Sequence, residues 1–184
     1  LVELMGGRDA FIGKLDSLFT ADSKLEGEST SVDISGLIGQ YAHGNEPSHH
    51  IAHLYNYVGQ PWRTQEIVDE VLHTLYFNNP DGLSGNEDCG QMSAWYILNA
   101  MGFYQVCPGK PVYSIGRPLF NEATVHLKDG KSFKVIAHNN SRDNKYVRSI
   151  VLNGNKLETP FFTHQDIVDG GTLELTMGLS LIHI

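Results

Sequence analysis

Two polar segments of the chain carry residue types that could perform chemistry. The first, Gly44-Asn45-Glu46-Pro47-Ser48-His49-His50, places an amide, a carboxylate and two imidazoles at the expected start of a helix. The unpaired N–H groups and positive dipole of that end favour the ionised form of Glu46. The alternative is a helix cap by Asn45 with an acid in the first turn. Adjacent helical residues point about 100° apart, so at least one of His49 and His50 should face a polar surface or cleft.

The second segment is richer in acids. Three carboxylates and two amides lie between Asp81 and Gln91, in the order Asp81, Asn86, Glu87, Asp88 and Gln91. Carboxylates this dense repel one another, so they must be hydrated, cap the following helix, or hold a cation or a catalytic water. The spacing is not that of an EF-hand. Hard oxygen ligands brought from separate loops nevertheless suit Ca²⁺.

Helical spacing of apolar residues continues to about Tyr104. We expect Trp95 and Tyr96 to lie in the core of the last helix rather than to serve as sugar platforms. The helices should be one ending near Phe19, one capped by Asp33 and stopped by Gly44, one from Pro47 to Gly59, one capped by Thr64, and one from Gly90 to Met101 that ends at Gly102.

Beyond residues 107–111 the pattern becomes that of strands. Apolar residues at 124–127 and 133–136 flank a turn, residues 150–152 precede Asn153-Gly154, and apolar residues alternate at 173–177. The fold class should therefore be α+β, with helices first and an antiparallel sheet afterwards. We expect residues 1–106 and 107–178 to form two regions, and residues 179–184 to be a disordered or artificial tail.

Composition excludes several functions. The 184 residues are 41% hydrophobic and carry a net charge of −8, and no segment approaches the roughly 20 apolar residues of a membrane span. Residues 1–105 hold 14 acids and 4 bases, which argues against nucleic-acid or membrane-surface binding and suits a neutral polyol or a cation. Two cysteines cannot form a disulfide framework, and no Cys/His spacing resembles a zinc site.

The two polar segments resemble a known family. Gly44 to His50, the Pro80-Asp81-Gly82-Leu83 lead-in, Gly85 to Tyr96, and Gly102-Phe103-Tyr104 followed by Cys107-Pro108-Gly109 resemble glycoside hydrolase family 92 in order and spacing. The members of this family are calcium-dependent, exo-acting α-mannosidases. The resemblance extends over nearly all of the chain, to about Gly178.

The resemblance implies an inverting mechanism on an (α/α)6 barrel followed by a small antiparallel β domain. It implies that Asp88 is the general base and that the position of Asn86, commonly acidic in the family, here orients water or sugar without accepting a proton. It implies Ca²⁺ held by Glu46 and, with less support, Asn45. We expect the remaining polar residues of the two segments to contact a mannose-containing glycan, namely His49, His50, Glu87 and Gln91.

The general acid of the family is missing. It belongs to a Glu-Gly-Asn type motif upstream of Gly44, and Glu26-Gly27-Glu28 matches only two letters and lies too close. We therefore expect a C-terminal fragment that lacks the N-terminal part of the enzyme and is inactive alone. The family's glycan substrates imply a periplasmic or secreted location.

Two alternatives remain open. One is a non-catalytic, calcium-dependent carbohydrate-binding or interaction module, and the other is a structural helical bundle with a β cap and no site. The structural bundle would gain support if the two polar segments lay at opposite ends of the structure.

Overall fold

The computed structural model describes residues 1–25, 31 and 33–180, so Glu26-Gly27-Glu28 and positions 181–184 of the expected tail lie outside the described residues. No helix in this described part is long and apolar enough to cross a membrane. The helical elements are α1 (Arg8–Thr20), η1 (Glu46–Ser48), η2 (Ile51–Val58), α2 (Pro61–Thr74), α3 (Gln91–Met101), η3 (Lys128–Gly130) and α4 (His164–Val168).

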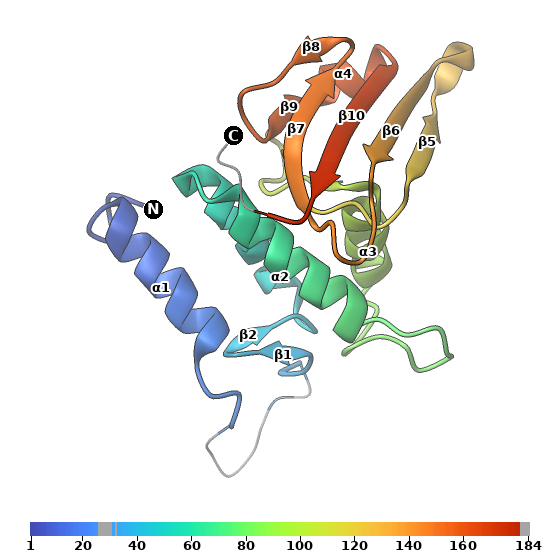
Figure 1. Ribbon diagram of the computed structural model, residues 1–184. Helices are drawn as coiled ribbons and strands as arrows, with labels where there is room; N and C mark the ends of the chain where they lie inside the picture. The colour runs from blue at the N-terminus through green and yellow to red at the C-terminus, as the bar shows by residue number, and fades with distance from the viewer. Residues whose placement is uncertain (26–30, 32, 181–184) are drawn as a thin grey trace.

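The strands form a small hairpin and two larger sheets. In Figure 1 the five-stranded sheet lies on the opposite side of α2 from α1. The hairpin pairs β1 (Leu37–Ile38) with β2 (Tyr41–Ala42). The three-stranded sheet has the order β3-β4-β9 and the five-stranded sheet the order β5-β6-β10-β7-β8. Their bounds are β3 (Phe103–Tyr104), β4 (Val112–Ile115), β5 (Glu122–His126), β6 (Ser132–His138), β7 (Tyr146–Leu152), β8 (Asn155–Lys156), β9 (Phe161–Thr163) and β10 (Gly171–Gly178).

Two hydrophobic cores follow this division. The first gathers apolar residues of α1, the β1–β2 hairpin, η2 and α2 around Trp95. The second lies over the sheets, from Phe103 to Met177, and partly buried Leu98 and Met101 of α3 pack against it. Helix α3 therefore joins the helical part of the chain to the strands, and the fold is mixed α+β as the sequence predicts.

Most of the predicted helices are present. Helices α1 and α3 have the expected bounds, and Gly102 ends α3 in the left-handed conformation (φ 104°). The segment from Pro47 to Gly59 is helical but consists of 3₁₀ turns. A 3₁₀ helix aligns residues three apart. Accordingly His53 and Asn56 both reach the Ser114 hydroxyl, at 3.1 and 2.6 Å.

The helix predicted from Asp33 to Gly44 is wrong. Leu37, Ile38 and Tyr41 of this segment form the β1–β2 hairpin instead, with Gly39-Gln40 as the connecting pair. Gly39 has φ +59°, and a Cβ there would lie 2.4 Å from the Leu18 carbonyl oxygen. The close packing of this turn on α1 therefore requires glycine and decides against the helix.

The cap predicted at Thr64 is also wrong. Helix α2 begins at Pro61, and Thr64 lies fully buried in its first turns. Proline suits the first helical position because its missing N–H would be unpaired there in any case. The helix thus starts about one turn earlier than the Thr64 signal indicates.

The β region differs from the prediction in one pairing. Both predicted hairpins and the alternating strand at 173–177 are present, but β10 pairs in parallel with β6 and antiparallel with β7. Helix α4 packs against β6 and returns the chain to the end at which β6 starts. Strand β10 therefore runs in the direction of β6, and the sheet is mixed.

A buried ion pair links α2 to the strand region. Arg117 Nε lies 2.9 Å from Asp69 Oδ1, and the two side chains are only 3% and 11% exposed. The contact is too poorly aligned to count as a hydrogen bond, so its attraction is chiefly between the charges. The pKa of Arg117 is lowered by burial, an effect that the Asp69 charge opposes. His73 and Arg142 also approach Asp69 Oδ1, at 3.2 and 3.6 Å.

We predict that Asp69→Asn lowers the free energy of unfolding by about 3 kcal/mol, because it leaves the Arg117 charge buried without a counterion. Urea denaturation measures the change. Asp143→Asn, which alters an exposed carboxylate, is the matched control and should change the stability by less than about 0.5 kcal/mol. Equal stability of the two variants would contradict the role given to Asp69.

Candidate functional site

The two polar segments meet at one pocket of about 510 Å³. The first segment contributes four lining residues, α3 contributes Gln91, and the remaining wall comes from β3 and the loop after it. The lining residues are Glu46, Pro47, His49, His50, Gln91, Tyr104, Gln105, Val106 and Pro108. The two segments therefore do not lie at opposite ends of the molecule. The interpretation as a helical bundle without a site gains no support from their placement.

The Glu46 carboxylate at this pocket interacts with that of Asp88, a residue outside the lining set. The pKa of Asp88 is raised above its usual value, first because the protonated form hydrogen-bonds to Glu46, and then by desolvation and by the Glu46 charge. Glu46 is half-buried, and its Oε1 atom is buried with no hydrogen-bond partner among the described residues. Asn45 occupies the N-cap position and Glu46 the first turn, as the alternative of a helix cap expects, but the Asn45 side chain makes no capping hydrogen bond. Glu46 is therefore an uncompensated acceptor at the pocket wall.

Asp88 is held by an unusual backbone. Asp88, Cys89 and Gly90 all have positive φ, at 48°, 58° and 89°. Only glycine adopts this conformation without strain, and Asp tolerates it better than most other residues. The turn places the Asp88 carboxylate on the exposed rim of the site, immediately before α3 begins. Strain of this kind, of order 1 kcal/mol or more per residue, is common at functional sites.

Other acids and amides of the second segment differ in their surroundings. Both oxygens of Glu87 accept hydrogen bonds from Ser93, one from the backbone N–H at 3.1 Å and one from the hydroxyl at 2.8 Å. Glu87 thus caps the first turn of α3, and its contact with sugar stays a prediction. Asn86 and Asp81 are exposed.

The two adjacent histidines have different environments. His49 is buried, and its Nε2 lies 2.9 Å from the carbonyl oxygen of His43. Gln91 Nε2 lies 3.1 Å from Nδ1 of His49, and the Trp95 indole donates to the His49 carbonyl at 3.0 Å. His50 is half-buried and lines the pocket, which meets the expectation that the pair cannot both be core. Burial lowers the pKa of His49, so its imidazole is neutral near pH 7.

His43 is a neighbour of the candidate site that the motifs of the sequence do not indicate. Its ring stacks on that of His49 with centroids 4.7 Å apart. Tyr76 donates to the Met92 carbonyl and so accepts from His43 Nε2 at 2.7 Å, which leaves His43 Nδ1 to accept from Tyr41 at 2.8 Å. Burial, together with the His49 charge, lowers the pKa of His43 to about 3. No local sequence signal marks His43, because its partners come from four separate elements.

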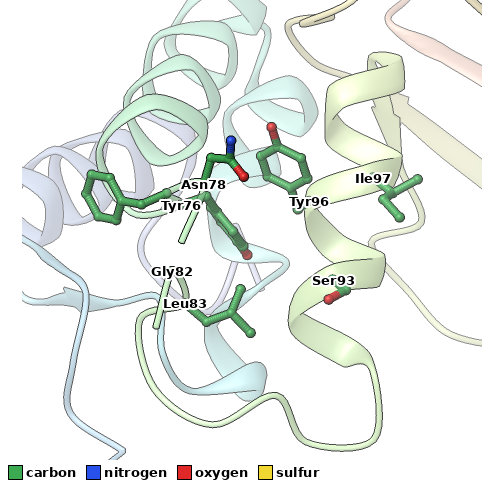
Figure 2. A pocket seen from close by; sticks show the side chains of 8 residues that line it. Tyr76, Asn78, Gly82, Leu83, Ser93, Tyr96 and Ile97 are labelled. Atoms are coloured by element: carbon green, nitrogen blue, oxygen red, sulfur yellow. The ribbon is translucent and has the colours of Figure 1, made fainter. Parts of the chain in front are cut away.

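A second pocket of about 510 Å³ lies elsewhere on α3. Figure 2 shows Tyr76 and Leu83 on one side of it, with Ser93, Tyr96 and Ile97 of α3 on the other. It contains no acidic residue, since its lining is Tyr76, Phe77, Asn78, Gly82, Leu83, Ser93, Tyr96 and Ile97. Trp95 is fully buried as predicted, whereas Tyr96 is half-buried at this second pocket.

The donor set fits part of a hard-cation site. Within residues 1–25, 31 and 33–180 there is no group of three or more His, Cys, Asp or Glu side chains that could hold a metal ion. The Glu46 and Asp88 carboxylates could supply two of the six to eight oxygen donors that Ca²⁺ takes. The unpartnered Oε1 of Glu46 is the observation that favours a cation, because a buried carboxylate oxygen without a donor is costly.

Comparison with known proteins supplies the class. A family model described as the glycosyl hydrolase family 92 catalytic domain matches residues 1–179. The sequence is 30% identical over 181 residues to an uncharacterized secreted glycosidase of Arthroderma benhamiae. The family 92 α-mannosidase BT3965 of Bacteroides thetaiotaomicron, in complex with mannoimidazole, superposes with a TM-score of 0.90 at 42% identity. The inverting mannosidase BT2199 of the same organism superposes with a TM-score of 0.82 at 43% identity.

These likenesses, together with a carboxylate pair beside a pocket, define a glycoside hydrolase domain. The chain belongs to glycoside hydrolase family 92. It spans only part of its relatives. The matches cover 97% of this chain but 21% of the Arthroderma protein, 96% of this chain and 23% of BT3965, and 97% of this chain and 25% of BT2199.

We predict that the protein loses stability as the pH falls below about 6.5. The pKa is lowered to about 3 for His43 and to about 4 for His53, chiefly by burial. Unfolding exposes both rings, which then take up protons near pH 6.5 that the folded state does not bind. Each histidine should therefore lower the free energy of unfolding by up to about 1.4 kcal/mol per pH unit. Urea denaturation over that range measures the slope.

The control for this prediction is a histidine outside the core. His126→Asn, at an exposed strand position, should leave the slope unchanged, and His43→Asn should make it shallower. A stability that is constant from pH 7 to about pH 4.5 would show that the buried rings are protonated in the folded state.

Proposed function

We propose that this chain forms the part of an inverting, calcium-dependent exo-α-mannosidase that carries the general base. The single observation that carries the proposal is the Glu46–Asp88 carboxylate pair at a pocket, in a chain of family 92. Two structural relatives are named α-mannosidase and inverting mannosidase, and one of them binds mannoimidazole. A mannose-containing glycan is the corresponding substrate.

In this proposal Asp88 activates the attacking water. An inverting site separates its acid and base by roughly 6.5 to 9.5 Å, to leave room for that water. Glu46 hydrogen-bonds to the protonated form of Asp88, so the two carboxyl groups lie too close to be such a pair. Glu46 is therefore not the acid. The proton donor would come from another part of a longer polypeptide, since the family 92 relatives are about four times the length of this chain.

The proposed role of Glu46 is to bind Ca²⁺, with Asn45 as a further candidate ligand. A bound divalent cation would hold sugar hydroxyls and help to distort the ring. Its charge also reduces the repulsion between Glu46 and Asp88, so that Asp88 can remain ionised as a base requires. The buried Oε1 of Glu46 supports this assignment.

The residues predicted to contact sugar differ in how accessible their side chains are. His50 and Gln91 line the pocket and remain candidates for direct contact. His49 also lines the pocket but is buried, and it contacts Gln91 through Nδ1, so its contribution would be to position that amide. Exposed Asn86 keeps its proposed role of orienting water or sugar, whereas Glu87 would act mainly by holding the start of α3.

Three wider features belong to the same proposal. Residues 1–106 would be the closing helices of an (α/α)6 barrel, and residues 107–178 the β region that follows it. Strand β3 precedes this boundary and pairs with β4, so the two regions share a sheet. The proposed location is periplasmic or secreted, supported by the description of the Arthroderma relative as secreted.

We predict that Ca²⁺ binds to the chain and that Glu46→Ala weakens binding at least tenfold, because it removes the buried oxygen donor. Isothermal titration calorimetry with Ca²⁺ alone measures this. Asp81→Asn removes an exposed carboxylate of the same acidic segment outside the pocket and should retain the wild-type affinity. Absence of calcium-dependent heat in every variant would remove the metal from the proposal.

We also predict that the 184-residue chain does not hydrolyse an aryl α-mannoside, because the sequence ahead of Gly44 has no Glu-Gly-Asn type motif to supply the general acid. The expected rate equals that of buffer, for wild type and for Asp88→Asn alike. Hydrolysis by the wild type that Asp88→Asn abolishes would show that the acid lies within this chain. Calcium-dependent sugar binding with no role for Asp88 would favour the carbohydrate-binding module.

A further inference from the structure

The hydrogen-bond directions at the pocket wall are fixed by a backbone carbonyl. The carbonyl oxygen of His43 can only accept, so Nε2 of His49, 2.9 Å away, must carry the proton and donate. In a neutral imidazole the other nitrogen is then an acceptor. His49 is buried, and burial disfavours a charged ring. His49 Nδ1 therefore needs a donor.

Gln91 supplies that donor, and the same amide nitrogen also donates to the Tyr104 hydroxyl. Its Nε2 lies 3.1 Å from His49 Nδ1 and 3.2 Å from the Tyr104 hydroxyl oxygen. An amide NH₂ has two hydrogens, so it can donate to both acceptors at once. The reverse orientation of the amide would place an oxygen against the lone pair of Nδ1 and is excluded. Both hydrogens of Gln91 are thus used inside the protein.

Two hydrogen-bonding functions are left over. Tyr104 accepts from Gln91, which leaves its own O–H as a donor, and burial raises the pKa of Tyr104, which keeps the proton in place. Oε1 of Gln91 is left as an acceptor. Among the hydrogen bonds found between described residues, neither group has a further partner, and both residues line the pocket.

The ring of Tyr104 is fixed by its neighbours, so its hydroxyl keeps one position at the pocket. It packs against His53 and Trp95, with centroids 5.5 and 6.2 Å away, and both of those side chains are fully buried. A hydroxyl on a fixed ring pays little entropy to bind a ligand.

We propose that His49 is a positioning residue that sets the polarity of the pocket wall, so that Tyr104 donates a hydrogen bond to the ligand and Gln91 accepts one. The wall thus presents one donor and one acceptor beside an acidic rim. A sugar hydroxyl both donates and accepts, so neighbouring hydroxyls of a polyol match this pattern. The ligand half of this inference rests on the proposed function, whereas the polarity half does not.

Heteronuclear NMR of uniformly ¹⁵N-labelled chain tests the polarity half without any ligand. Two-bond ¹H–¹⁵N correlation at pH 7 should show His49 with its proton on Nε2, and a coupling across the hydrogen bond should join Gln91 Nε2 to His49 Nδ1. Gln91→Glu replaces the donor by an acceptor, so His49 should then protonate at Nδ1. A proton on Nδ1 of His49 in the wild type would overturn the proposal.

Calorimetry with methyl α-mannoside in the presence of Ca²⁺ tests the ligand half. Tyr104→Phe deletes only the donor and should weaken binding about fivefold, the usual loss for one neutral hydrogen bond. Tyr96→Phe removes the same atom at the second pocket and should bind as the wild type does.

The outcomes separate this inference from the proposed function. Equal binding by Tyr104→Phe and wild type would show that Tyr104 does not donate to the sugar. No binding by the wild type, with the His49 tautomer as stated, would overturn both the mannosidase proposal and the ligand half but leave the polarity standing.

Discussion

The structure of the site depends on keeping two stacked, buried imidazoles neutral. His43 and His49 lie with ring centroids 4.7 Å apart, where two positive charges would repel strongly in a medium of low dielectric constant. Neutrality requires each ring to donate through one nitrogen and accept through the other. The partners that meet this requirement are Tyr41 of β2, Tyr76 just after α2, the His43 carbonyl, and Gln91 at the start of α3. The same constraint therefore holds these elements together and orients the pocket wall.

The rim of the site has the opposite character. A hydrogen bond to Glu46, desolvation and the Glu46 charge raise the pKa of Asp88, and Asp88 stands on a strained backbone where two successive non-glycine residues have positive φ. The interior of the site therefore holds neutral imidazoles, whereas its rim holds two carboxylates. The ion pair between Asp69 and Arg117 gives this support a rigid base, since it ties α2 to the chain that leads into the sheet. A ligand that brings positive charge or many hydrogen-bond donors would relieve the rim without disturbing the interior.

The sequence predicts the parts of the fold that are encoded locally. Gly102 and Asn153-Gly154 force a helix end and a hairpin through their own backbone preferences, and both appear where expected. The β1–β2 hairpin was missed because its glycine is selected by the distant Leu18 carbonyl, and the parallel β6–β10 pair because it depends on where α4 returns the chain. At the site, Glu46 and Asp88 belong to recognisable motifs. Tyr104 and His43 have their roles only through partners far away in sequence, so no local pattern identifies them.

The central position of β10 has a kinetic consequence. This strand lies between β6 and β7, yet it is the last strand of the described chain. Until it arrives, β6 and β7 each expose an unpaired edge, and the second core lacks Leu173, Leu175 and Met177. Pairing β6 with β10 closes a loop of more than 30 residues, which makes this step slow relative to the local hairpins. During synthesis the β region therefore passes through a state prone to edge-to-edge association, and the arrival of β10 ends it.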